Sequence, residues 1–366
     1  MNAASRRRTM LYITPVVPAD TGNGLAMRAA SVLRRLARDH DVSLLSIPLY
    51  PPGPGQTGDT LPEWVHHECV AARRLDTENP AYPGERFDIV HVYRLASVPH
   101  ARPYVTMAAE WHLDLDDVES RTFARIAKLA LQPASQQAIA RAARQEEHVL
   151  HTWQRVYVCS DVDRSWLLAT HPATSADVVV LPNVVALPPD PPASRHQPPI
   201  TFLFVGTLAY APNADGIVWF CREVLPTIRE LTPVPVKVCI VGVGASDEVR
   251  QLEHIPEVQY VGPVDRLDEW YVQADIVIAP LRAGGGTRIK ILEALAHRRP
   301  VVSTTIGAEG LSLHDETHLL IADRPRHFAE HCLRLIGDAA LAHRLADDGH
   351  AAVATSVRQF WSVDEP

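Results

Sequence analysis

Between residues 200 and 322 the chain alternates short, almost wholly apolar runs with stretches of helical period. Each run ends in a glycine, a proline or a short loop before the next helical pattern begins. Strands that are apolar along their whole length are typical of a parallel sheet covered on both faces. The pattern therefore predicts a doubly wound α/β domain. The expected strands are 200–206, 236–242, 258–262, 275–280, 300–304 and 318–322.

The first half shows the same rhythm. An amphipathic helical pattern covers 25–38, and a longer helical region covers about 120–152, with a break expected near Pro133. We expect a second doubly wound domain here. Its expected strands are 10–16, 42–47, 87–92, 112–115 and 155–160.

A proline-rich segment separates the two halves. Residues 182–199 hold seven prolines and no apolar periodicity, which is typical of a stiff linker. We expect a domain over 1–185, a linker over 186–199 and a domain over 200–345. A last helix over 346–366 is expected to cross back to the first domain through its aromatic residues, the alternative being a frayed end.

Composition narrows the classes of function. The formal net charge of −8 argues against a nucleic-acid-binding protein, which usually carries a basic face. The five cysteines show no Cys-x-x-Cys spacing, as expected for reduced thiols in a cytoplasmic protein. No apolar stretch is long enough to span a bilayer. We interpret the apolar run at 10–16 as a strand and not as part of a signal peptide.

The stretch "AGGGTRIKILEALA" at 283–296 carries the most chemistry. Glycines 284–286 let the backbone approach a ligand closely, and a helix is expected to start near Thr287. The start of a helix attracts anions, and Arg288 and Lys290 add two positive charges there. Glu293 lies further along the helix, where its carboxylate can accept hydrogen bonds from sugar hydroxyls. The combination predicts a site for a nucleoside diphosphate.

A simpler interpretation is a solvated charged helix face, with Glu293 paired to Lys290 or His297. The position directly behind three glycines at a strand end favours the binding site. Only three of the 35 Lys and Arg residues are lysines, so Lys290 stands out in this motif.

Residues 200–323 resemble the donor-binding domain of the family-four retaining glycosyltransferases. The matching pieces are "FVGTLAYAPNADGIVWFCREVLP", "IVGVG" and "VQYVGPVDRLDEWYVQADIVIAPLRAGGGTRIKILEALAHRRPVVSTTIGAEGL". In the first half, "TGNGLAMR" and "LPNVV" are similar in a looser way. The resemblance implies the GT-B fold, an α/β architecture of two facing doubly wound Rossmann-like domains.

The resemblance also implies roles for particular residues. Glu293 matches the second glutamate of the family's Glu-x7-Glu motif, which holds the ribose. Residues 287–289 (Thr287, Arg288 and Ile289) match the segment whose backbone contacts the diphosphate. The backbone of Val264 is expected to meet the base, and Gly206 to lie beside the phosphates.

Two departures from the family pattern bear on catalysis. The first glutamate of the motif is replaced by Gly285, next to Gly286. The family's Arg and Lys after the first strand of this domain are also absent, and Asn213 and Asp215 stand there. Arg288 and Lys290 are expected to supply the missing cations from another direction.

The activity implied by the resemblance is transfer of a sugar from a nucleotide diphosphate sugar to an acceptor hydroxyl. Arg288 and Lys290 would stabilise the leaving diphosphate without a metal or other cofactor. Two alternatives stay open: a nucleotide-sugar epimerase of the same fold, and a non-catalytic donor-binding subunit. The acceptor, whether a small molecule or a glycan or lipid-linked chain, is not indicated by the sequence.

"HLDLDDVES" at 112–120 is the acidic candidate site of the first half. We place Asp116 and Asp117 at a strand end near the transferred sugar, as catalytic candidates, with His112 as a rival. A divalent-cation site and an acidic helix start are the alternatives.

The loop "PADTGNGLAMR" at 18–28 is the second candidate of the first half. Gly22, Asn23 and Gly24 follow the first strand, where an acceptor or phosphate would be reached. A plain tight turn between strand and helix is the alternative.

Three further patterns are weaker. "GVGASD" at 242–247 lacks the third glycine of a dinucleotide fingerprint, so NAD binding is not expected. "HHEC" at 66–69 has no second ligand pair, and we expect no metal there. The arginines of helix 25–38 could contact an anionic membrane surface, but a solvated face is the better interpretation. They are Arg28, Arg34, Arg35 and Arg38.

Overall fold

The computed structural model describes residues 7–47, 49–50, 61–74, 85–104, 108–129 and 136–362. The chain divides into two compact units. Unit 1 comprises 1–120, 137–183 and 361–366, and unit 2 comprises 121–136 and 184–360. The predicted break near Pro133 lies outside the described residues.

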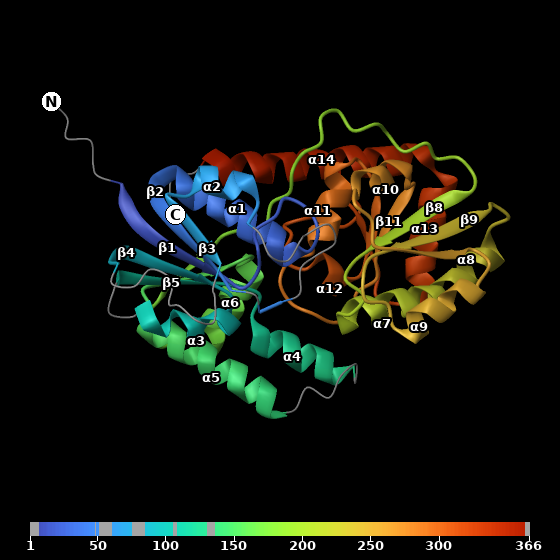
Figure 1. Ribbon diagram of the computed structural model, residues 1–366. Helices are drawn as coiled ribbons and strands as arrows, with labels where there is room; N and C mark the ends of the chain where they lie inside the picture. Colours follow the sequence, from blue (N-terminus) through green and yellow to red (C-terminus); the bar gives the residue numbers. More distant parts are fainter. Residues whose placement is uncertain are drawn as a thin grey trace. The chain divides into compact units, whose positions relative to one another are not determined.

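Unit 1 is built on a seven-stranded parallel sheet in the order β3-β2-β1-β4-β5-β6-β7. Its helices α1 and α2 lie on one face, and α3, α5 and α6 lie on the other (Figure 1). The strands are β1 (Arg8–Thr14), β2 (His40–Ser46), β3 (Ala71–Arg74), β4 (Phe87–Tyr93), β5 (Ala108–Asp116), β6 (Arg155–Val158) and β7 (Asp177–Val180). The helices are α1 (Gly24–Asp39), α2 (Glu63–Glu68), α3 (Val98–Ala101), α5 (Gln136–Thr152) and α6 (Asp161–Thr170).

Unit 2 has a six-stranded parallel sheet in the order β10-β9-β8-β11-β12-β13. Helices α7, α8 and α9 cover one face, and α10 and α11 cover the other (Figure 1). The strands are β8 (Ile200–Val205), β9 (Val236–Val241), β10 (Val258–Gly262), β11 (Ile276–Ala279), β12 (Val301–Ser303) and β13 (Leu320–Ile321). The helices of this region are α7 (Ala211–Trp219), α8 (Leu225–Leu231), α9 (Asp247–Arg250), α10 (Asp268–Gln273), α11 (Ile289–Ala296), α12 (Thr305–Ala308), α13 (Pro325–Gly337) and α14 (Ala339–Ser362).

The core of unit 2 shows why its strands were readable from the sequence. Residues of β8, β9 and β11 are almost completely buried, among them Phe202, Ile240 and Ile278. They pack against Phe220 and Phe328, which come from the helical layer on one face. A sheet covered on both faces removes every strand side chain from water, and burial of apolar area is the main favourable term.

The last helix differs from its predicted bounds. α14 begins at Ala339, seven residues before the expected start, and runs as one helix of 24 residues. At its end, Arg38 of α1 donates a hydrogen bond to the Trp361 carbonyl and lies 5.8 Å from the centre of that indole ring. Trp361 is thereby grouped with unit 1, and the residues after 362 lie outside the described ones.

The helix α4 (Glu119–Lys128) contains the junction between the two groups of residues. Its residues from Arg121 onward belong to unit 2. Residues 182–199, which include the predicted linker, form no helix or strand.

Candidate functional site

In unit 2 the strand order reverses between β8 and β11. Chain connections run outward from this pair of neighbouring strands in both directions, toward β10 on one side and β13 on the other. Loops leaving the carboxyl ends of two such strands diverge and leave a crevice, which is where ligands bind in open α/β sheets. Gly206 follows β8, and the glycine loop 283–287 follows β11. The strand order therefore brings these two predicted segments to one place.

The glycine loop adopts backbone conformations that side chains disfavour. Gly284 has φ of 117° and Gly286 has φ of 66°. A Cβ at Gly284 would lie 2.8 Å from Nη2 of Arg288. The loop therefore needs glycine at both positions, and its backbone folds closely around the arginine.

Arg288 lies at the N-cap of α11, so the helix begins at Ile289, two residues after the expected start near Thr287. Its side chain donates a hydrogen bond from Nη1 to the Gly285 carbonyl. Only 9% of the residue is exposed. Within the described part of the chain, Nε and Nη2 have no hydrogen-bond partner. A buried guanidinium with two unsatisfied donors is costly unless an anion completes it, so this geometry suits a phosphate oxygen.

Lys290 of α11 contacts the segment after β8. Its Nζ donates a 2.7 Å hydrogen bond to Oδ1 of Asn213 and lies 4.3 Å from the centre of the Phe204 ring. A Cβ at Gly206 would lie only 2.8 Å from the same Nζ. Asn213 occupies a position where the family has a basic residue. Here its amide oxygen binds the ammonium of Lys290, which comes from α11.

Burial and the neighbouring charge of Arg288 lower the pKa of Lys290 to about 7. The carboxylate of Glu293 opposes that shift without cancelling it. A diphosphate bound nearby would favour the charged ammonium and raise the pKa of Lys290 again. The ligand would therefore restore the positive charge that binds it.

Glu293 lies one turn further along α11. Tyr271 of α10 donates a 3.0 Å hydrogen bond to its Oε2. Burial raises the pKa of Glu293 to about 7, although Tyr271 and Lys290 both act to lower it. The predicted alternative pairing with Lys290 or His297 is not among the ion pairs of the described residues; His297 contacts Asp268 instead.

The remaining donor-side candidates lie at the same edge of the sheet. Val264 follows Gly262, the last residue of β10, and is partly buried. Thr287 is partly buried just before α11, and Ile289 is the first residue of that helix. The expected backbone contacts of Thr287, Ile289 and Val264 with a nucleotide stay predictions.

Sequence reasoning missed two ion-pair systems at this edge. Arg282 forms two hydrogen bonds with the Asp215 carboxylate, one of them 2.9 Å from Nε. This pair explains the acidic residue found where the family has a basic one. Arg282 lies directly before the glycine motif of 283–296, and no sequence pattern marks it as the partner of Asp215.

The second missed system involves α4. Arg125 donates to both oxygens of Glu309, at 2.6 and 2.8 Å, and to the Gly284 carbonyl at 3.0 Å. Arg121 donates to the same carboxylate at 3.0 Å. Burial would raise the pKa of Glu309, but the arginines, Arg288 among them, outweigh it and lower the pKa. Glu309 follows the short helix after β12, so its place at a carboxyl strand end was the available signal.

In unit 1, the acidic segment forms an ion-pair network at the carboxyl end of β5. Arg28 pairs with Asp114 at 2.7 Å, and both side chains are buried. Arg28 also donates to Oδ1 of Asn183 at 3.0 Å. The loosely similar segments "TGNGLAMR" and "LPNVV" therefore meet through this arginine, which the sequence analysis had grouped with the solvated arginines of the helix.

Asp116 is held in a strained backbone conformation, with φ of 64°. It accepts hydrogen bonds from the Tyr93 hydroxyl and the Asn183 amide, each at 3.3 Å. Burial raises its pKa, although Arg28 and Arg94 act in the opposite direction. Left-handed backbone at a non-glycine residue is a frequent mark of functional sites.

Asp117 and His112 are placed differently from Asp116. Asp117 pairs with Arg94, whose own φ is 69°. His112 lies within β5, opposite His91 of β4, and not at the strand end where the sequence placed it. Its ring is buried, and burial lowers its pKa to about 4. The predicted strand 112–115 began at His112, whereas β5 begins four residues earlier, at Ala108, and ends at Asp116.

The loop after β1 forms the start of α1. Gly22 has φ of 108°. Asn23 is the N-cap, and its Oδ1 accepts a 2.9 Å hydrogen bond from the backbone of Ala26. Gly24 is the first helical residue. These contacts fit the tight-turn alternative. The loop nevertheless follows β1, and the strand order of the unit 1 sheet reverses between β1 and β4.

The expected solvated arginine face of α1 is wrong for two of its four members. Arg28 is 1% and Arg35 is 7% exposed. Arg34 pairs with Asp20 and lies 4.0 Å from the centre of the Trp64 ring. Because these side chains are taken up in contacts within unit 1, the helix does not present a row of free cations to a membrane.

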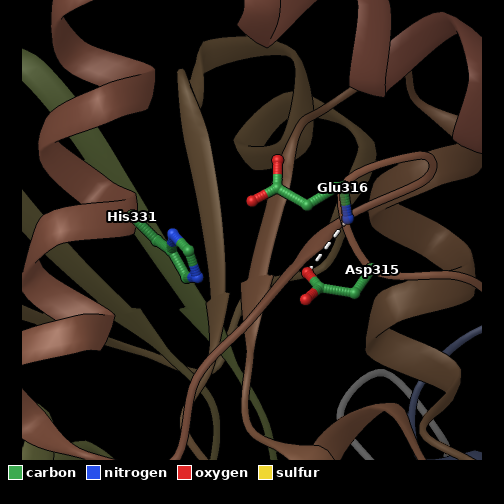
Figure 2. A group of neighbouring side chains, drawn as sticks. All are labelled: Asp315, Glu316 and His331. Carbon is green, nitrogen blue, oxygen red and sulfur yellow. Dashed lines mark hydrogen bonds between the residues drawn. The ribbon is translucent and has the colours of Figure 1, made fainter.

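One group of potential metal ligands occurs in the described part of the chain: Asp315, Glu316 and His331 (Figure 2). Asp315 accepts a hydrogen bond from the backbone of Glu316 (Figure 2). Glu316 is paired to Arg334 at 2.6 Å, and Arg334 also lies 3.3 Å from His331. The arginine already supplies the positive charge, so this group is better explained as an ion-pair cluster. His66, His67 and Cys69 form no such group.

Comparisons with known proteins show a family match in the second half of the chain and a similar fold over nearly the whole chain. Residues 199–338 match the family model described as glycosyl transferases group 1. Sucrose-phosphate synthase from Thermosynechococcus elongatus is similar in structure over 95% of this chain and 94% of its own, with a TM-score of 0.70 and 16% identity. HepE of Anabaena, solved in complex with UDP and glucose, is similar over 97% of both chains, with a TM-score of 0.69 and 13% identity.

Residues 199–338 therefore match the group 1 glycosyl transferases, and the chain as a whole has the two-domain α/β fold of these GT-B structures, in line with the resemblance seen in the sequence. Among curated proteins, it is 30% identical over 139 residues to an uncharacterized 44.6 kDa protein in the cps region of Klebsiella pneumoniae. That match spans 36% of this chain and 36% of the relative. Among the described helices, none is both long and apolar enough to cross a membrane.

Proposed function

We propose that the chain transfers a sugar from a uridine diphosphate sugar to an acceptor hydroxyl, with retention at the anomeric carbon and without a metal ion. The observation that carries the proposal is the buried guanidinium of Arg288, whose Nε and Nη2 are unpartnered among the described residues. It lies beside Lys290 at the point where the strand order of unit 2 reverses. The presence of UDP in the HepE structure supports the choice of nucleotide.

The chemical need for these two cations is plain. When the bond between the anomeric carbon and the phosphate oxygen breaks, negative charge develops on the diphosphate. Arg288, Lys290 and the backbone N–H groups at the start of α11 stabilise that charge from fixed positions. Two cations and a helix start perform the task that a divalent metal performs in other transferases, so we propose that the reaction is metal-independent.

The proposed transfer is a direct substitution on the face that the leaving group vacates. The acceptor oxygen forms a bond to the anomeric carbon as the bond to the phosphate oxygen breaks. The acceptor proton passes to the departing diphosphate oxygen. This route needs no covalent bond to the protein and leaves the anomeric configuration unchanged.

Donor recognition is assigned to the same edge of the sheet. Glu293 accepts hydrogen bonds from the ribose hydroxyls, and the backbone at Val264 meets the base. Gly206 and Gly286 allow the phosphates to approach the backbone, because neither carries a side chain. At position 285, where the family has its first glutamate, the backbone carbonyl of Gly285 accepts a hydrogen bond from Arg288.

We assign the acceptor side to unit 1, with Asp116 as the strongest candidate. Its left-handed backbone and partial burial hold the carboxylate at the carboxyl end of β5. Asp117 holds Arg94 in the same network. Gly22, Asn23 and Gly24 belong to the neighbouring loop, where a phosphate or acceptor group is the proposed contact.

The test is turnover of UDP-sugars by three variants. Arg288→Ala and Lys290→Ala are expected to lower kcat by a factor of about a hundred or more, which is the usual effect of losing one oxyanion donor. Lys237→Ala is the matched control, because this lysine is the second residue of β9 and so lies at the amino ends of the strands, away from the site at their carboxyl ends. Activity should survive a chelator, and the product should keep the donor's anomeric configuration by NMR. Wild-type turnover in both site variants would refute the assignment, and donor binding without transfer or hydrolysis would indicate a non-catalytic subunit.

A further inference from the structure

The carboxylate of Glu293 is held by a buried tyrosine that the sequence did not single out. Tyr271 lies in α10 and is fully buried. Its hydroxyl lies 3.0 Å from Oε2 of Glu293 and 3.4 Å from the carbonyl oxygen of Lys290. Both atoms are acceptors, so the tyrosine hydroxyl is the donor, and the shorter contact is the principal one.

The tyrosine ring is itself fixed. It stacks on the imidazole of His297, with ring centres 4.9 Å apart and planes tilted by 21°. His297 donates from Nδ1 to the Glu293 carbonyl at 2.8 Å, and its Nε2 lies 3.0 Å from Oδ1 of Asp268. These contacts connect Tyr271 and Asp268 of α10 with His297 at the end of α11 and with Glu293. Neither ring can turn without breaking one of these contacts.

We propose that Tyr271 is a positioning residue for the nucleotide: it binds Oε2 of Glu293 and so leaves Oε1 as the oxygen that receives the ribose hydroxyls. The inference rests on the proposed function, because it assumes that Glu293 meets the ribose. It adds a specificity role to a residue that has no contact with the substrate of its own.

The hydroxyl also affects the charge of the carboxylate. Burial alone raises the pKa of Glu293, and the hydrogen bond from Tyr271 limits that rise. Two other charged groups act on this carboxylate: Lys290 of its own helix lowers its pKa, and Asp268 of α10 raises it. Without the hydroxyl, the carboxyl group stays protonated to higher pH and becomes a poorer acceptor.

The experiment compares UDP with 2′,3′-dideoxy-UDP, which lacks both ribose hydroxyls. Dissociation constants are measured by calorimetry for wild type and Tyr271→Phe, across the pH range that brackets 7. Phenylalanine keeps the stack on His297, so the packing of α10 is preserved. The dideoxy ligand keeps the diphosphate, so the titration of Lys290 affects both ligands alike and cancels in their ratio.

The expected result is a roughly fivefold to tenfold loss of UDP affinity in Tyr271→Phe, since a net hydrogen bond is worth about 1 kcal/mol. Affinity for the dideoxy ligand should not change. Because the ionised carboxylate is the better acceptor, the preference for UDP should rise with pH, and in the variant this rise should move to higher pH. In a Glu293→Gln background, Tyr271→Phe should have no further effect on the preference.

The outcomes separate the inference from the function on which it rests. If wild type does not bind UDP, or binds both ligands equally, the ribose role of Glu293 fails. If wild type prefers UDP and Tyr271→Phe keeps the full preference and pH profile, the positioning role fails while the proposed function stands. Tyr260→Phe is the control, since its hydroxyl bonds the Gly242 carbonyl in the same unit at 3.1 Å. An equal loss in that variant would attribute the effect to general loosening and overturn the inference.

Discussion

Lys290 illustrates how a binding residue works against the stability of the empty protein. Its ammonium is removed from water beside Arg288, and burial lowers its pKa to about 7. One hydrogen bond to Asn213 and the face of the Phe204 ring are its main compensation. A site that binds an anion through buried cations is therefore less stable when it is empty than a site without them.

This arrangement predicts that Lys290→Met stabilises the empty protein. In the unfolded chain a lysine titrates near its ordinary pKa of about 10.4. Between about pH 7 and that value the unfolded state binds more protons than the folded state, so the wild-type free energy of unfolding rises with pH. The destabilisation is complete below about pH 7 and disappears toward pH 10.

Methionine keeps the packing against Phe204 and removes the titration. We expect Lys290→Met to gain about 1 kcal/mol or more at neutral pH, with the gain shrinking as the pH rises. Urea unfolding at several pH values measures it. A variant that is less stable than wild type at pH 7 would show that Asn213 and the ring more than compensate the buried charge.

At the residue scale, the sequence was informative where backbone freedom and charge occur together. Three glycines followed by Arg288 and Lys290 could be recognised, because few structures require that combination. The side chains that contact Glu293 and the glycine loop could not, because Tyr271 and Arg125 come from elsewhere in the chain and no local pattern shows which residues they will meet. The start of β5 was placed at His112 and not at Ala108 for a related reason: how far a strand extends depends on its neighbour in the sheet, here β4, which the local pattern does not reveal.

At the scale of elements, α11 is positioned by close packing as well as by its loop. Gly349 of α14 approaches it so closely that a Cβ there would lie 2.5 Å from Cδ2 of Leu295 and 2.9 Å from the His318 carbonyl oxygen. Leu295 is completely buried and has little room to move. The long last helix thus braces the helix that carries the candidate site.

We therefore expect Gly349→Ala to destabilise the protein by about 1–3 kcal/mol, the usual effect of overpacking. The matched control is Gly337→Ala at the end of α13, where a Cβ would meet nothing within 4 Å. That change should be neutral or stabilise by up to about 1 kcal/mol, because alanine has less freedom in the unfolded chain. Thermal unfolding of both variants measures the difference, and equal midpoints would contradict close packing of α14 on α11.

The elements themselves were predicted unevenly from the sequence. The six strands of unit 2 were all expected, and each was found within two residues of its predicted limits. In unit 1, β3 and β7 were missed: "AARR" has no strand-like character, and "DVVV" is a run of only four residues. The start of α14 was also misplaced, although Gly337 and Asp338 directly precede it and the Asp338 carboxylate accepts a hydrogen bond from the Leu341 backbone.

At the scale of the whole molecule, the two sheets share a design that explains where the candidates lie. Each is parallel, and each reverses its strand order once, between β1 and β4 in unit 1 and between β8 and β11 in unit 2. A reversal of this kind opens a crevice at the carboxyl edge whatever the side chains are. The sequence could predict the architecture because apolar strands, each ended by a glycine, a proline or a short loop, repeat along the chain. It could not specify the acceptor, whose contacts depend on the loosely similar first half.

The central claim is that unit 2 binds a diphosphate through Arg288 and Lys290, and its most direct test is calorimetric titration with UDP, UMP and uridine. If the claim is correct, UDP binds wild type and Lys237→Ala equally, UMP binds much more weakly, and uridine weakest of all. Arg288→Ala and Lys290→Ala should lose most of the difference between UDP and UMP, while their weak uridine binding is unchanged. If either variant binds UDP as tightly as wild type does, or if UDP and uridine bind wild type alike, the diphosphate site is not where we place it.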